Sequence, residues 1–155
     1  YKPDLLIVVG DVNSTLAASI TANKMGIKLA HLESGLRSFD NSMPEEHNRI
    51  LTDKLSDLFF VTEPSGFDNL KKEDVDDQRI LFSGNTMIDT LVAFSDQIDK
   101  SEILEKLQIV PDQYLLMTMH RPATVDEKNG LEKLLILIDD LTNNYKIVFP
   151  IHPNN

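Results

Sequence analysis

The chain has 155 residues, of which 41% are hydrophobic, and a formal net charge of −10. This composition supports a packed core, offers no apolar run of roughly 18 residues that would predict a membrane span, and argues against a general nucleic-acid surface. Neither cysteine nor a signal-peptide pattern is present, so we expect a cytoplasmic protein without disulfides or thiolate metal sites.

Strand-like and helix-like segments alternate along the first two thirds of the chain, beginning with the apolar strand 5–9. A continuous run of this kind is typical of a parallel strand that is covered on both faces. A helix is predicted to start with Asn13 or Ser14 as its N-cap, to run to Met25, and to stop at Gly26. Further strands are expected over 27–32, 58–61 and 80–83, and helices over 44–55, 65–72 and 87–98.

An acidic stretch, residues 96–113, is predicted to hold one short helix and to connect two domains. A second α/β unit is expected after it, with a strand over 114–119, a helix over 126–141 and a strand over 146–150. Such alternation predicts parallel sheets with right-handed crossovers. We therefore assign residues 1–98 to the C-terminal part of a first α/β domain, 99–113 to a connecting segment and 114–155 to the start of a second α/β domain. Because the chain begins at Tyr1 and stops just after a strand, we expect a piece of a longer protein.

Acidic side chains stand where the first two strands end. Asp11 closes LLIVVGD, and Glu33 follows the second strand, with Gly35-Leu36-Arg37 offering a cation beside it. Ligands of parallel α/β sheets bind at this edge, so both acids are candidates for chemistry. The structural alternatives are an N-cap or Asx turn for Asp11 and a surface ion pair for Glu33.

Two more acids, Glu45 and Glu46, begin the helix that Pro44 introduces. Adjacent helical residues point about 100° apart, so at most one of them is expected to face a site. Arg49 follows at the spacing of an intrahelical ion pair, which together with helix-dipole stabilisation is the structural alternative. His31 and His47 lie in no pattern that is typical of a site.

A basic pair, His120 and Arg121, follows the strand LLMTM. The arginine fork binds two phosphate oxygens at once, and the next helix adds free N–H groups. His152 repeats the placement at a strand end with a weaker signal. Acids at the ends of the first two strands and a basic pair at the end of a later strand predict proton transfer on a substrate with an anionic group. GxGxxG, Walker, HExxH and metal-spaced motifs are absent, and we expect no metal and no cofactor.

Five segments together carry a resemblance to a known family: GDVNSTLA, AHLESGLRSFDNSMPEEHNRILTD, TEPSGFDNL, SGNTMIDTL and MHRPATVD. In this order they resemble the non-hydrolysing UDP-N-acetylglucosamine 2-epimerases, and ESGLRS with MPEEHNR is the specific part. The resemblance implies a glycosyltransferase-B type α/β fold, with a UDP-sugar between two Rossmann-like halves, and a homodimer. It also implies interconversion of UDP-GlcNAc and UDP-ManNAc for cell-surface polysaccharide precursors, by elimination of UDP and its readdition to an unsaturated 2-acetamidoglucal.

The resemblance implies particular site residues as well. The family's acids correspond to Asp11, Glu33 and Glu45, and the histidine of its HR motif, near the diphosphate, corresponds to His120. Which acid serves which face of the sugar stays open. The positions expected to bind substrate are Arg37, Arg49, Asn85, Arg121 and His152.

One departure from the family pattern follows the HR motif, where many members carry HRxEN and this chain has Pro122-Ala123-Thr124. Ala123 supplies no carboxylate, which affects the detail of this loop more than the reaction class. Two other functions stay open: a hydrolysing epimerase that releases ManNAc and UDP, and a glycosyltransferase or binding domain of the same fold. Residues 1–155 alone are expected to be inactive, because the second wall of the cleft is missing.

Overall fold

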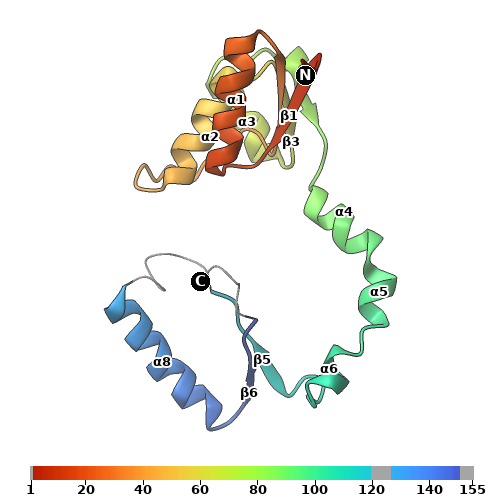
Figure 1. The fold of residues 1–155 in the computed structure, drawn as a ribbon, viewed down its shortest axis with the longest axis vertical. Coiled ribbons are helices and arrows are strands. Elements are labelled where there is room, and N and C mark those ends of the chain that lie inside the picture. Colours follow the sequence, from red (N-terminus) through yellow and green to blue (C-terminus); the bar gives the residue numbers. More distant parts are fainter. Residues whose placement is uncertain (1, 120–126, 151–155) are drawn as a thin grey trace. The chain divides into compact units, whose positions relative to one another are not determined.

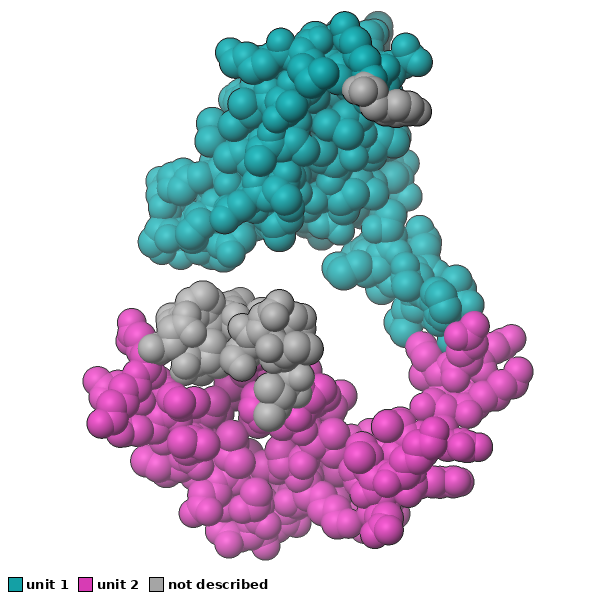
Figure 2. Space-filling model, viewed as in Figure 1, with its two compact units in different colours: residues 1–94 teal, residues 95–155 magenta. Residues whose placement is uncertain are grey.

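The structure is a computed structural model that describes residues 2–119 and 127–150. The chain divides into two units, Tyr1–Phe94 and Ser95–Asn155, which are coloured separately in Figure 2. Each unit contains its own parallel sheet with helices, so the predicted α/β class is confirmed (Figure 1). Within the described residues no helix is both long enough and apolar enough to cross a membrane.

The first unit is built on a four-stranded sheet with the order β1-β2-β3-β4. The strands are β1 (Leu5–Val9), β2 (Lys28–Leu32), β3 (Leu58–Val61) and β4 (Ile80–Phe82). The connecting helices are α1 (Asn13–Met25), α2 (Pro44–Leu55) and α3 (Pro64–Lys72), and a 3₁₀ turn, η1 (Asp77–Arg79), precedes β4. All neighbouring strands run parallel. The predicted alternation is therefore confirmed, with ends that differ by one residue at β2, α3 and β4.

The strand register decides which side chains share a face of this sheet. Val8 pairs with His31, His31 with Phe59, and Phe59 with Ile80. This row lies on the face that the helices cover, because Val8 packs in one buried cluster with α1 and Phe59 in another with α3. Helices α1 and α2 pack side by side on that face (Figure 1). His31 therefore occupies a core position within the sheet.

The opposite face of β1 is exposed in the described residues. Leu5, Ile7 and Val9 keep 39%, 56% and 51% of their surface, and only Val8 of this strand is buried. Within the described residues the predicted cover on both faces is present on one face only. Strands that follow one another in order, joined by crossovers of one hand, place their helices on the same side of the sheet.

Two further boundaries differ from the predictions. Helix α1 begins at Asn13 with Val12 as N-cap and no side-chain cap, whereas Asn13 or Ser14 was expected to cap it. The predicted helix 87–98 is divided at Phe94 into α4 (Thr86–Ala93) and α5 (Ser95–Asp99). Residues that favour helix starts, Ser95 and Asp96, follow this break. Gly26 ends α1 in the left-handed conformation, as predicted.

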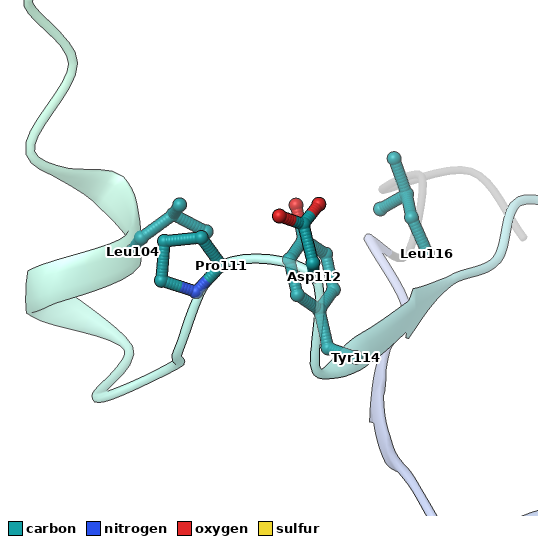
Figure 3. Close-up of a pocket in the computed structure, with 5 residues that line it drawn as sticks. All are labelled: Leu104, Pro111, Asp112, Tyr114 and Leu116. Carbon is teal, nitrogen blue, oxygen red and sulfur yellow. The ribbon is translucent and has the colours of Figure 1, made fainter.

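The second unit contains α6 (Ile103–Lys106) and a β–α–β arrangement of β5 (Tyr114–Leu116), α8 (Lys128–Thr142) and β6 (Lys146–Val148). β5 and β6 pair in parallel, as predicted. The two strands end at Leu116 and Val148, before the predicted ends at 119 and 150, and α8 ends one residue beyond the predicted end at 141. An open hollow, shown in Figure 3, is lined by Leu104, Pro111, Asp112, Tyr114 and Leu116. None of the predicted site residues that the structure describes lines this hollow, so we assign no ligand to it.

The turn after β2 packs directly on α3, and this contact yields a test of the fold. A Cβ added to Gly35, at φ +77°, would stand 2.2 Å from the Gly66 carbonyl oxygen. We expect Gly35→Ala to destabilise the protein by about 3 kcal/mol or more, through overpacking added to left-handed strain. Gly26→Ala is the matched control, because Gly26 has a similar φ of +63° and a Cβ added there would have no neighbouring atom within 4 Å. Gly26→Ala should lower the free energy of unfolding, measured by urea denaturation, by about 1 kcal/mol. Equal losses for the two variants would contradict the close contact between Gly35 and Gly66.

Candidate active site

The turn after β1 is held by helix α2. The carboxylate of Asp11 forms an ion pair with the Arg49 guanidinium, whose side chain is 14% exposed. The neighbouring Asn48 donates its side-chain amide to the Asp11 carbonyl oxygen at 2.8 Å and to the Asn13 side chain at 2.9 Å. Helix α2 therefore fixes both the backbone and the carboxylate of Asp11, and Arg49 lies beside a predicted catalytic acid.

The turn after β2 carries Glu33 in a left-handed backbone conformation, with φ of +71°. Such a conformation costs a non-glycine residue about 1 kcal/mol and persists only where the surroundings impose it, commonly at functional sites. Here the Glu33 N–H donates to the Phe60 carbonyl at 3.1 Å. A Cβ built on Gly10 would stand 3.5 Å from Glu33 Oε2. The Glu33 carboxylate thus lies against the turn that carries Asp11.

At the start of α2, Glu46 and not Glu45 turns inward. Glu46 is 1% exposed and accepts hydrogen bonds from the N–H groups of Ser38 at 2.9 Å and Phe39 at 3.0 Å. It also pairs with Arg49 at 3.0 Å, so this arginine bridges Glu46 and Asp11. Glu45 is exposed, and the described residues give its side chain no hydrogen bond or ion pair. The catalytic role of Glu45 stays a prediction.

The surroundings of Glu46 keep it ionised. Burial disfavours its charge and is the largest single influence, but the two backbone N–H donors, the Ser38 hydroxyl and the charge of Arg49 together outweigh it. The pKa of Glu46 therefore lies below its usual range. An ionised Glu46 in turn keeps Arg49 in place beside Asp11.

The side chain of Arg37 points into the protein. It is 2% exposed, and its guanidinium pairs with Asp53 at 2.7 Å and with Glu73 at 2.9 Å. Burial acts against its charge most strongly, yet these two carboxylates together raise the pKa of Arg37. The prediction that Arg37 places a cation beside Glu33 is wrong, because Asp53 and Glu73 hold it elsewhere. The substrate-binding role of Arg37 stays a prediction.

The other predicted residues fall into two groups. Asn85 is exposed after β4, where it caps α4 by accepting the Met87 N–H at 2.9 Å. His120, Arg121 and His152 lie outside the described residues. The structure therefore brings together Asp11, Glu33 and Arg49 but gives no geometry for the predicted basic half of the site.

Three residues that the sequence reasoning missed support this edge: Asn48, His31 and Asp53. Knowledge of the strand pairing register would have been needed to place His31 on the helix-covered face. With that face known, helical periodicity would have placed Asn48 and Asp53 on the inner face of α2. The carboxylates of Asp11 and Glu33 lie on neighbouring turns, and Arg49 of α2 pairs with Asp11. Such an arrangement suits proton exchange with a bound substrate.

Comparison with known proteins gives consistent matches over the whole chain. A family model described as UDP-N-acetylglucosamine 2-epimerase matches residues 1–155. The chain is 40% identical over 157 residues to a UDP-N-acetylglucosamine 2-epimerase of Methanococcus maripaludis, which covers 98% of this chain and 43% of that protein. It is 36% identical over 155 residues to the UDP-2,3-diacetamido-2,3-dideoxy-D-glucuronate 2-epimerase of Pseudomonas aeruginosa, with 98% and 43% covered.

Solved structures give the same result. The crystal structure of Methanocaldococcus jannaschii UDP-GlcNAc 2-epimerase in complex with UDP-GlcNAc and UDP matches with a TM-score of 0.86 and 38% identity. The match covers 97% of this chain and 42% of that chain. These neighbours have the glycosyltransferase-B type architecture, which confirms the predicted fold class. The chain spans less than half the length of these relatives.

The buried Glu46 yields a prediction with a defined pH dependence. Glu46→Gln should lower the free energy of unfolding at pH 7 by about 2 kcal/mol, because it removes the counter-charge of Arg49 and leaves an N–H donor without an acceptor. Since the pKa of Glu46 is lowered by folding, its stabilisation is complete above the unfolded pKa of about 4.3 and is lost as pH falls through the folded value.

The difference between parent and variant should therefore shrink below about pH 4 in urea unfolding measured from pH 7 to pH 3. Glu45→Gln is the matched control, since this exposed neighbour should change stability by less than about 0.5 kcal/mol. A difference for Glu46→Gln that stays constant over this pH range would contradict the assigned contacts.

Proposed function

The chain belongs to the UDP-N-acetylglucosamine 2-epimerase family, and from this membership we propose that the full-length protein inverts carbon 2 of UDP-GlcNAc to give UDP-ManNAc. The observation that carries the proposal is the adjacency of two acid-bearing turns, with the Glu33 carboxylate against Gly10 and Asp11 next to it. A relative whose structure contains UDP-GlcNAc and UDP supports a UDP-sugar as the substrate. We propose a role in supplying cell-surface polysaccharide precursors.

The chemistry has to solve a problem of acidity. Carbon 2 of the sugar is not next to a carbonyl, so its hydrogen cannot simply be removed and returned. In the proposed route, a base takes the proton from carbon 2 while the bond from carbon 1 to the UDP oxygen breaks. The electron pair of the C–H bond becomes the double bond of 2-acetamidoglucal, and UDP leaves as an anion. Readdition of UDP to carbon 1, with a proton delivered to the opposite face of carbon 2, completes the inversion.

This route needs proton-transferring groups on both faces of the sugar and cations at the departing diphosphate. We propose Asp11, Glu33 and Glu45 for the first task, without assigning a face to each. His120 and Arg121 are proposed for the diphosphate. Arg49 is proposed to hold Asp11 in position, which its ion pair supports. Asn85 and His152 are proposed as further substrate contacts.

A related substrate is the second candidate. The similarity to the Pseudomonas aeruginosa enzyme, which is named for a 2,3-diacetamido-glucuronate sugar, favours testing this UDP-sugar beside UDP-GlcNAc. A hydrolysing reaction, which releases free ManNAc and UDP, is separated from the proposed one by its products. We further propose that the full-length protein works as a homodimer in the cytoplasm.

The test is solvent exchange at carbon 2. Full-length protein with UDP-GlcNAc in D₂O should place deuterium at carbon 2 and form UDP-ManNAc, as seen by proton NMR. Asp11→Asn, Glu33→Gln and Glu45→Gln should each reduce kcat by about 10²- to 10⁴-fold, the usual contribution of a general acid or base.

Asp68→Asn serves as the matched control, because this exposed acid of α3 lies outside the proposed site and should leave turnover unchanged. Absence of exchange with either UDP-sugar would overturn the proposed function. Free reducing sugar as the main product would support the hydrolysing reaction, and unchanged turnover in all three acid variants would support a binding or transferase role.

A further inference from the structure

A buried histidine and aspartate lie behind the two acid-bearing turns. His31 is fully buried, with Nδ1 at 2.6 Å from Asp53 Oδ1 and Nε2 at 2.9 Å from the Gly10 carbonyl oxygen. A carbonyl oxygen only accepts hydrogen bonds, so Nε2 is the donor to Gly10, and Nδ1 lies within hydrogen-bond distance of the Asp53 carboxylate. Both ring nitrogens are therefore satisfied in an apolar row between Val8 and Phe59.

The same aspartate also holds the second turn. Asp53, on α2, is 3% exposed, and its Oδ2 accepts the Gly35 N–H at 3.1 Å and pairs with Arg37 at 2.7 Å. One carboxylate thus contacts the turn after β2 directly and reaches the turn after β1 through His31. In this way α2 couples the backbone next to Glu33 with the backbone next to Asp11.

We propose that Asp53 and His31 are positioning residues that fix the two acid-bearing turns relative to each other, and so set the separation of the Asp11 and Glu33 carboxylates. This inference rests on the proposed function of those acids. The second turn contains Glu33 in left-handed backbone (φ +71°), a conformation that a non-glycine residue keeps only where its surroundings maintain it. Asp53 and His31 are enclosed and act only through the residues they bind.

Positioning and simple core stabilisation make different predictions. A purely structural pair changes the stability of the protein but leaves kcat of the folded fraction unchanged. A positioning pair changes kcat, because displacement of a catalytic group by about 1 Å costs on the order of 100-fold in rate. The bond from His31 to the Gly10 carbonyl should then matter more than its bond to Asp53, since only the first of them touches the Asp11 turn.

Two amide variants of His31 separate the two bonds. The side-chain nitrogen of glutamine can take the place of Nε2 and keep the bond to Gly10, whereas that of asparagine takes the place of Nδ1 and keeps only the bond to Asp53. In full-length protein we expect His31→Asn to lose about 100-fold in kcat, with KM within about 3-fold, and His31→Gln to stay within about 10-fold of the parent. The readouts are deuterium incorporation at carbon 2 per folded protein and amide hydrogen exchange of the peptide 5–16.

His47 provides the matched control, because its Nε2 also contacts a backbone carbonyl, that of Asn41 at 2.9 Å, but at an exposed position. The same two substitutions there should leave kcat unchanged. Asp53→Leu provides a second route should His31→Asn not fold, because it can bind neither the Gly35 N–H nor His31 and should lower kcat of the folded protein about 100-fold. Asp53→Asn is its matched control, since its amide can contact His31 Nδ1 and still accept from Gly35, so kcat should stay within about 10-fold of the parent.

Each outcome either supports or overturns the positioning role of His31 and Asp53. A lower kcat and faster exchange of peptide 5–16 in His31→Asn, with both largely kept in His31→Gln, supports the positioning role. Equal kcat in the two His31 variants, or kcat kept within about 10-fold in folded Asp53→Leu, overturns it. If the parent itself shows no deuterium incorporation, the proposed function fails, and the amide exchange of peptide 5–16 still decides whether His31 holds this turn.

Discussion

The parallel pairing of β1 with β2 is the constraint on which the candidate site depends. Val9 lies opposite Leu32, so the two strands end together and release their next residues at one edge of the sheet. Those residues are Gly10-Asp11 and Glu33. A shift of this register would separate the acids and would also move His31 away from the helix-covered face. The pairing register of β1 and β2 therefore determines where the acids lie, and the conformation of the loops matters less.

Helix α2 then contributes charge where packing alone would call for apolar side chains. Its inner face carries Glu46 and Asp53, which meet Arg49, Arg37 and His31 in contacts largely removed from solvent. Networks of buried charge are costly to desolvate, and well-packed apolar residues often give equal or greater stability. Such a network does fix the orientation of the groups it joins, because each carboxylate accepts hydrogen bonds from several groups at once.

The sequence predicts the elements of this chain better than the orientation of its side chains. Apolar runs, Pro44 and Gly26 place strands β1 to β4 and helices α1 to α3 within about one residue, since these signals are local. The inward turn of Glu46 in place of Glu45, the burial of Arg37 and the core position of His31 all depend on contacts between distant segments. The open face of β1 likewise follows from strand order, which a single sequence does not reveal. Motif resemblance predicted Asp11 and Glu33 as site residues without any of this geometry, and their roles stay predictions.

The backbone at Glu33 has a consequence for evolution in the laboratory. A glutamate with φ of +71° occupies a conformation that glycine adopts without penalty, so replacement by glycine would relieve strain while removing a carboxylate. Selection for heat resistance alone would favour that exchange, whereas the proposed catalytic role of Glu33 means that selection for turnover would oppose it. Stability and the proposed activity thus compete at this single position.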